Sequence, residues 1–173
     1  MNIYTKVTRT GTIDDVITLA DVKRAIGVLD NYEDDEIQSQ IYTAFELAER
    51  YCYRCFTPCD VVAERTDNAM SFFLPYGENV VFTSVEVDGE AHTDYDYSEV
   101  SGRFTLKNVT RYEKLTITYS CGFTSLPASI DRGIKFMVSN IRNSGQDFVA
   151  GMTVSDLPLR AIHLLDAEKH HVI

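Results

Sequence analysis

Three cysteines in the first third of the chain have a spacing that could bind a metal. Cys52, Cys55 and Cys59 form a Cys-x2-Cys-x3-Cys pattern, and thiolates at such spacing bind zinc or iron–sulfur clusters. However, no histidine lies near them, and Cys121 is far along the chain. Cys52 and Cys55 also continue the apolar stripe of a predicted helix, where free cysteine behaves as a small hydrophobic residue. We therefore predict that these thiols pack in a core and form neither a metal site nor a disulfide.

Histidines near the C-terminus could form a second metal site. His163, His170 and His171 lie close in sequence to Asp166 and Glu168, and His163 and Asp166 have helical spacing. A chain end holds ligands poorly because terminal segments fray. We interpret these histidines as solvated or as interface residues.

Clustered carboxylates could bind calcium or act as an acid and base pair. The run Glu33–Glu36 lacks the oxygen spacing of an EF-hand loop, and acidic residues are favoured in the first turn of a helix. Asp94 and Asp96 alternate with tyrosines, which is typical of the polar face of a strand. His92 lies alone beside a predicted hairpin turn and is expected to be solvated.

Motifs for nucleophilic catalysis and for nucleotide binding are missing from the sequence. It contains no Gly-x-Ser-x-Gly, no Gly-x-x-x-x-Gly-Lys and no Gly-x-Gly-x-x-Gly. We therefore predict no catalytic residue, no cofactor and no enzymatic activity. A small metal-dependent enzyme using the cysteines or His163 and His170 is the alternative from another class.

The elements that must position these residues begin with two helices, predicted within 18–56. Thr18 is followed three residues later by Asp21, which predicts a capped helix start, and Gly27 predicts its end. From Glu33 onward, apolar residues recur every three or four positions and define one face of a long helix. These residues are Ile37, Ile41, Ala44, Phe45, Ala48, Cys52 and Cys55.

Between residues 59 and 123 the pattern changes to alternating, β-branched and aromatic residues. This pattern predicts strands, and Asp88-Gly89 predicts a tight hairpin between two of them. We expect a small antiparallel sheet. Its strands include Val80–Val87, Tyr95–Tyr97, Arg103–Leu106 and Lys114–Tyr119.

Helical spacing returns after the strands. Pro127 is placed to begin a helix, and a last short helix is predicted from Leu157-Pro158 onward. The fold class is therefore α+β: a helical frame (18–56 and 127–169) with an inserted antiparallel sheet (59–123). At 173 residues we expect one domain, 1–173. Its third helix has an apolar face of Ile130, Ile134, Met137, Val138 and Ile141.

Composition excludes several classes of protein. No apolar run approaches the roughly 20 residues of a membrane span, and we expect no signal peptide and synthesis in a cytosol. The 26 acidic residues outnumber the 16 basic ones, so the formal charge is −10. Tight nucleic-acid binding needs clustered Lys and Arg, so if DNA is involved we expect it to slide past this protein and not to be bound tightly.

Taken in order, short motifs resemble those of one known family. They are Thr18-Leu-Ala-Asp-Val-Lys23, Glu33–Ile37, Ala48–Phe56, Leu74-Pro75, Val80–Val87, Asp88-Gly89, Gly102-Arg103, Thr116–Phe123, Pro127–Ile130, Leu157-Pro158 and Leu164-Leu165. In this order the chain resembles the head-tail connector proteins, or neck adaptors, of tailed bacteriophages, in the variant with a β insertion. It departs from their pattern after Leu165, where Asp166–His171 replaces a Tyr- or Arg-rich ending, and after Ile141, where the helix ends early.

The resemblance implies a structural virion protein located in the neck. Its expected partners are the portal protein, a stopper or tail-completion protein, and further copies of itself in a ring, typically a dodecamer. DNA would only pass through the lumen, and no membrane is involved. A tail-completion or tail-terminator protein remains the alternative.

The C-terminal segment is the expected contact with the portal. Its apolar residues would form a clamp that becomes ordered on docking. The predicted interface residues are Leu157, Pro158, Ile162, Leu165, Val172 and Ile173.

Overall fold

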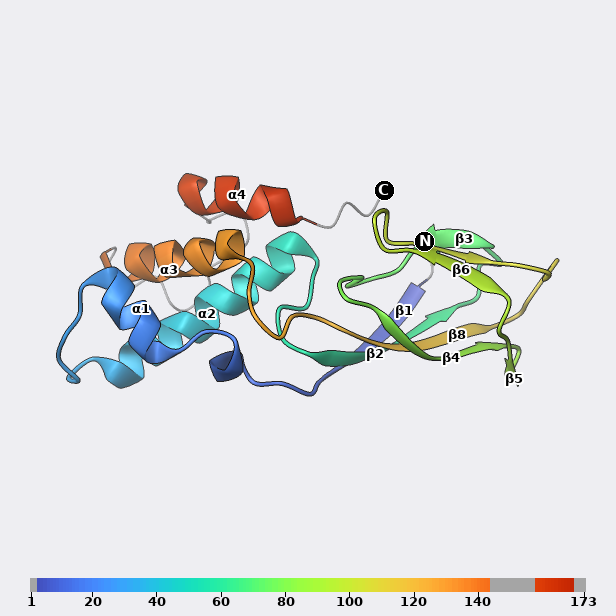
Figure 1. The fold of residues 1–173 in the computed structure, drawn as a ribbon, viewed down its shortest axis with the longest axis horizontal. Coiled ribbons are helices and arrows are strands. Elements are labelled where there is room, and N and C mark those ends of the chain that lie inside the picture. Colours follow the sequence, from blue (N-terminus) through green and yellow to red (C-terminus); the bar gives the residue numbers. More distant parts are fainter. Residues whose placement is uncertain (1–2, 144–157, 170–173) are drawn as a thin grey trace. The chain divides into compact units, whose positions relative to one another are not determined.

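The computed structural model describes residues 3–143 and 158–169, which are divided between two compact units. The sheet unit contains residues 3–11 and 57–123. The helical unit contains residues 12–56, 124–143 and 158–169. Together they form an α+β fold with antiparallel sheets (Figure 1), which confirms the predicted fold class. The expectation that the chain is one domain stays a prediction.

The helical unit begins with a short 3-10 turn, η1 (Ile13–Asp15), and the helix α1 (Leu19–Ile26). The Thr18 side chain accepts a hydrogen bond from the Asp21 backbone N–H at 3.2 Å, so the predicted cap is present. Gly27 ends the helix with φ of 76°, a left-handed conformation that glycine adopts without strain.

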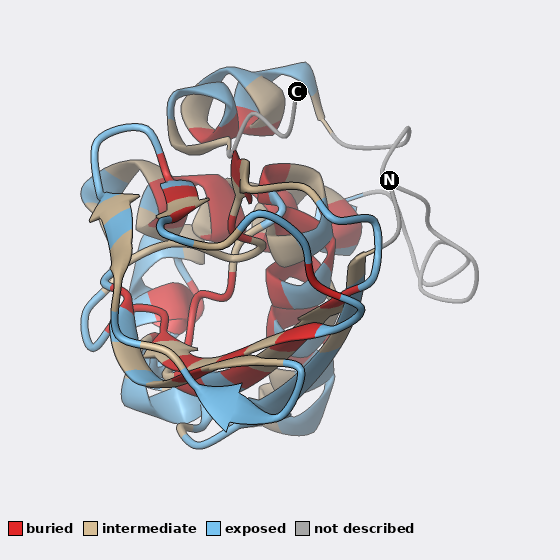
Figure 2. Cartoon of the chain, turned by 90° about the vertical axis from the view of Figure 1, so that its right-hand side faces the viewer, coloured by how far each residue is buried: buried red, intermediate tan, exposed pale blue. Residues whose placement is uncertain are grey.

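Three further helices complete this unit: α2 (Asp34–Cys52), α3 (Ala128–Asn143) and α4 (Leu159–Leu165), followed by the turn η4 (Asp166–Glu168). The predicted apolar faces of α2 and α3 are buried (Figure 2). Cys55 is also buried, but it lies beyond α2, because the helix ends at Cys52 and Tyr53 takes a left-handed conformation with φ of 54°. α3 starts one residue after Pro127, which accepts the first hydrogen bond of the helix from Asp131.

The sheet unit holds a five-stranded sheet in the order β1-β2-β8-β4-β5. Its strands are β1 (Ile3–Arg9), β2 (Cys59–Arg65), β8 (Leu115–Cys121), β4 (Val81–Val87) and β5 (Glu90–Ala91). All neighbours are antiparallel. The hairpin at Asp88-Gly89 is confirmed, with φ of 53° and 85° at its two turn residues.

A second, three-stranded sheet has the order β3-β7-β6. It consists of β3 (Ser71–Phe73), β7 (Arg103–Leu106) and β6 (Tyr95–Ser98). The expected single small sheet is thus wrong in number, because β3, β6 and β7 pair with one another and not with the strands of the larger sheet. Aromatic rings join the two sheets: Phe82 of β4 lies 5.1 Å from Tyr95 and 5.8 Å from Phe104, between ring centroids.

β1 was not predicted, although its sequence contains Ile, Val and two Thr residues, which favour strands. It pairs with β2 from Ile3 opposite Arg65 to Arg9 opposite Cys59. The sheet therefore draws one strand from outside the predicted insertion.

Candidate interaction surfaces

The acidic residues for which calcium binding and acid–base chemistry were considered have structural partners. Glu33 accepts hydrogen bonds from Arg142 at 2.6 and 3.1 Å, and Asp34 forms an ion pair with the buried Lys23. In the sheet unit, Asp96 lies 2.6 Å from Lys107, and Asp94 accepts a hydrogen bond from Asn108. Asp34, Asp35 and Glu36 lie in the first turn of α2, as predicted, but the side chain of the N-cap residue Glu33 makes no capping hydrogen bond. Asp94 directly precedes β6, and Asp96 lies in it.

His92 is half-buried, and its ring contacts backbone carbonyl groups that the sequence did not predict. Its Nε2 lies 2.9 Å from the Asp94 carbonyl oxygen and 3.1 Å from that of Lys107. Its backbone N–H donates to the Val85 carbonyl at 2.8 Å. The ring thus links the segment between β5 and β6 to the residue that follows β7.

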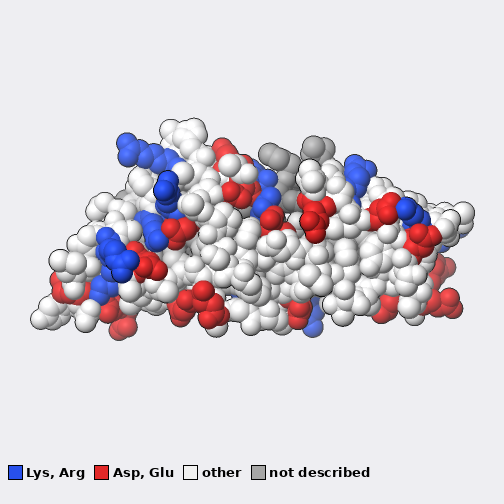
Figure 3. Space-filling view, in the orientation of Figure 1, with Lys and Arg blue, Asp and Glu red and all other residues white. Residues whose placement is uncertain are grey.

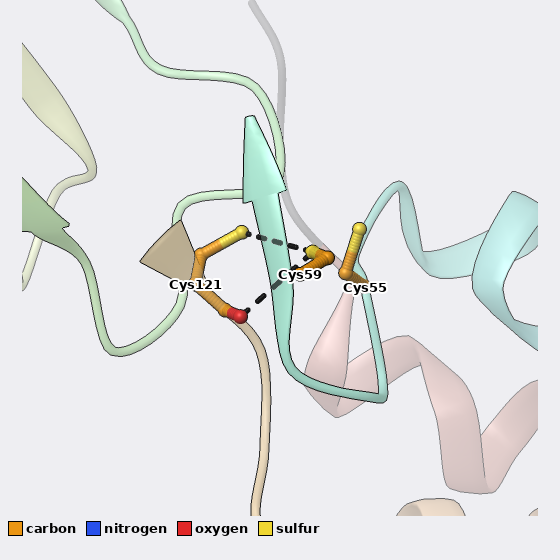
Figure 4. Close-up of side chains that lie close together, drawn as sticks. All are labelled: Cys55, Cys59 and Cys121. Atoms are coloured by element: carbon orange, nitrogen blue, oxygen red, sulfur yellow. Dashed lines mark hydrogen bonds between the residues drawn. The ribbon is translucent and has the colours of Figure 1, made fainter. Parts of the chain in front are cut away.

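The cysteines are buried and unbridged. Cys52 continues the buried stripe of α2, and burial raises the pKa of its thiol to about 12, which disfavours a thiolate. In the sheet unit, Cys59 and Cys121 are cross-strand partners whose Sγ atoms lie 3.5 Å apart (Figure 4). Cys52 packs in the core of the helical unit, and Cys59 and Cys121 pack in the core of the sheet unit.

α4 is fixed to the helical unit by its inner face. Ala161 and Leu165 are fully buried, and Leu165 lies against Gly133 of α3. A Cβ at Gly133 would come within 3.1 Å of Leu165 Cδ2, so glycine permits the two helices to approach closely.

Polar contacts hold the turn η4 that follows α4. The Tyr51 hydroxyl donates to Asp166, and this bond raises the pKa of Tyr51 to about 12. Ser129 Oγ donates to Glu168 at 2.5 Å, and Lys169 Nζ lies 4.5 Å from the Tyr51 ring centre. These contacts attach the end of the described chain to α2 and α3.

The predicted interface residues therefore separate into three groups. Leu165 faces the core, whereas Pro158 and Ile162 are half-buried. Leu157, Val172 and Ile173 lie outside the described residues. His163 of α4 is exposed, as predicted, and His170 and His171 are outside the described residues.

Exposed apolar side chains mark surfaces that the sequence pattern did not identify. On α4, Leu159 is 69% exposed. In the loop between α1 and α2, Leu29 and Tyr32 are 95% and 97% exposed, beside a hollow of about 460 Å³ whose lining includes Lys23 and Asp34. Large apolar groups this exposed are typical of protein–protein contacts. The signal in the sequence was three apolar residues, Val28, Leu29 and Tyr32, in an otherwise polar loop.

Charge is distributed without one dominant patch on the face shown in Figure 3, where acidic and basic groups are interspersed. Among the described residues, no helix is long and apolar enough to cross a membrane.

Comparison with solved structures shows which fold this is. The chain matches a chain from the neck of an empty GTA particle computed with C6 symmetry, with a TM-score of 0.72, 12% identity and 97% of both chains covered. It also matches a chain from the virion of a native gene transfer agent (GTA) particle, with a TM-score of 0.69, 12% identity and 96% of both chains covered. No protein-family description and no curated protein matches the sequence.

Proposed function

We propose that this chain is a structural subunit of a virion neck, an adaptor that forms a ring beneath the portal and joins the capsid to a stopper or to the tail. The shared fold over 97% of a chain from a GTA particle neck carries this proposal. The proposal agrees with the order of the short sequence motifs, which resembles that of phage neck adaptors.

A ring subunit acts by presenting two different surfaces to its neighbours, because a closed ring is built from heterologous contacts. The exposed Leu29 and Tyr32 of the α1–α2 loop and Leu159 of α4 provide apolar contact groups of the kind that such surfaces need. In this proposal the protein works through packing and needs no catalytic residue. Its charge of −10 would repel the phosphates of DNA in a lumen.

The burial of residues on α4 favours portal-contact residues that differ in part from those predicted from the sequence. Leu165 and Ala161 hold α4 in place, so they support the contact from within. Leu159, Pro158 and Ile162 lie on the accessible side and would touch the partner. In this proposal α4 would bind the portal as a helix that is already fixed in place.

A binding experiment tests the portal contact. Leu159→Asp should reduce capture of the chain on purified portal rings encoded in the same genome by at least tenfold, while the melting temperature stays that of the natural protein. Val100→Asp is the matched control, because Val100 is fully exposed in a turn of the sheet unit. Unchanged capture of the Leu159 variant would count against α4 as the clamp.

The number of subunits is a separate question. A neck computed with C6 symmetry is compatible with six or with twelve copies of a chain. We propose twelve, and a hexamer that forms regardless of the portal would instead support a tail-completion or terminator role.

A further inference from the structure

Two cysteines of the sheet unit are placed so that a covalent bond can join them. Cys59 begins β2 and Cys121 ends β8, and the two residues lie directly opposite each other in the antiparallel ladder. Their Sγ atoms point toward each other at 3.5 Å (Figure 4). We infer that Cys59 and Cys121 form a reversible disulfide when the protein passes from a reducing into an oxidising environment.

The backbone already has the geometry that this bond requires. Residues directly opposite each other on antiparallel strands have Cα atoms roughly 4.5–5.5 Å apart, and a disulfide joins Cα atoms that are roughly 4.4–6.8 Å apart. Both side chains lie on the buried face of the five-stranded sheet. The two sulfur atoms can therefore meet by rotation of the side chains, without movement of the strands.

The pair lies at the end of its ladder, where a small oxidant can reach it. Because β2 starts at Cys59 and β8 ends at Cys121, local opening of this one end exposes both thiols. Such opening costs less free energy at the end of an element than in its middle. Cys59 is fully buried, whereas Cys121 is 5% exposed, so Cys121 is the thiol that reacts first.

The oxidation is a thiol–disulfide exchange with a small disulfide, such as oxidised glutathione. The Cys121 thiolate attacks one sulfur of the small disulfide and releases the other half as a thiolate. The Cys59 thiolate then attacks the Cys121 sulfur and releases the remaining half. Two electrons pass from the cysteine pair to the small disulfide, and the two cysteine protons end on the two released thiols. An excess of small thiol reverses both steps.

The bond would close a long covalent loop. The two cysteines are 62 positions apart, and every strand of the sheet unit except β1 lies within the loop that they close. A disulfide stabilises a fold mainly by restricting the unfolded chain, and more so when the loop is long. Oxidation should therefore raise the melting temperature by roughly 5–15 °C. This inference concerns the chain itself and does not depend on the proposed ring.

A redox titration of the whole chain tests the inference. The folded protein is incubated with mixtures of oxidised and reduced glutathione, and the remaining thiols are then blocked in acid under denaturing conditions. The intact mass should show one internal disulfide and two blocked thiols. Peptide mapping without reduction should identify Cys59 and Cys121 as the joined pair. Dithiothreitol should reverse both the bond and the rise in melting temperature.

The other two cysteines provide matched controls, since all four are buried thiols. Cys59→Ala and Cys121→Ala should each abolish the difference in melting temperature between the oxidised and the reduced protein. The double variant Cys52→Ala/Cys55→Ala should keep that difference. Each variant is compared with its own reduced form, so a lower starting stability does not affect the comparison.

Three results would overturn the inference. They are four thiols that stay reduced in the folded protein at the highest ratio of oxidised to reduced glutathione, a disulfide that involves Cys52 or Cys55, and a bond that forms only after the chain is unfolded in urea. None of these results bears on the proposed function, because that function is tested by assembly on portal rings.

Discussion

Leu165 of α4 packs directly on Gly133 of α3, where even a Cβ atom would lie 3.1 Å from the leucine Cδ2. This contact shows that the Leu165 face of α4 is the inner face. The C-terminal segment was predicted to contact the portal through its apolar residues, but the most apolar face of its helix packs on α3. Only the opposite face of α4, with Leu159, remains for a partner.

Leu165→Ala should lower the free energy of unfolding by about 2–5 kcal/mol, because it removes a fully buried side chain and leaves a cavity against α3. Urea denaturation followed by circular dichroism measures this change. Leu159→Ala, on the exposed side of the same helix, should change stability by less than about 0.5 kcal/mol. Equal effects of the two substitutions would contradict the assignment of inner and outer faces.

Gly122→Ala should be more damaging than Gly89→Ala. Both glycines have positive φ, 104° and 85°, so either alanine introduces backbone strain of about 1 kcal/mol. At Gly122, however, the new Cβ would also lie 2.1 Å from the Thr57 carbonyl oxygen, whereas nothing lies within 4 Å at Gly89. Thermal denaturation compares the two variants, and a milder effect at Gly122 would show that this close approach is not present.

Asp67 should contribute its full stabilisation above about pH 4 and lose it progressively as the pH falls further. Its hydrogen bonds from the buried Arg65 hold the pKa of Asp67 below its ordinary value. The charged form is therefore favoured in the folded state, and its stabilisation is lost as pH falls through the lowered pKa. Asp67→Asn should destabilise by about 1–3 kcal/mol at neutral pH, and the difference from the natural protein should shrink in acid. A difference in unfolding free energy that is constant with pH would contradict this.

Tyr51 should stay protonated to a high pH. Its hydrogen bond to Asp166 raises its pKa to about 12, so the stabilisation is complete below about pH 10 and is lost as pH rises through the folded-state pKa. Ultraviolet titration should show a tyrosine that ionises near pH 12, and this step should disappear in Tyr51→Phe. Tyr53→Phe, at a residue 57% exposed, is the control and should leave that late step in place.

Patterns among neighbouring residues correctly predicted three local features of the fold. The α2 stripe from Ile37 to Cys52, the Thr18 cap and the Asp88-Gly89 hairpin are present because each depends on neighbours in the sequence. Sheet membership depends on distant partners, so β1 and the division into two sheets were missed. His92 was misjudged for the same reason, since one of its bonded carbonyls lies fifteen positions away.

The C-terminal helix was predicted in the correct part of the chain, but the orientation of its side chains was not. Apolar content identified the C-terminal helix, yet Leu159 and Leu165 are the same residue type and differ only in what α3 covers. The exposed Leu29 and Tyr32 were passed over because an apolar residue in a loop is as often buried as exposed.

The mass of the complex that the purified chain forms with portal rings tests the central claim most directly. Native mass spectrometry should show twelve copies of the chain added to one portal ring, and none added to a portal-free sample at the same concentration. A chain that stays monomeric beside intact portal rings, or a hexamer that ignores them, would contradict the neck-adaptor account.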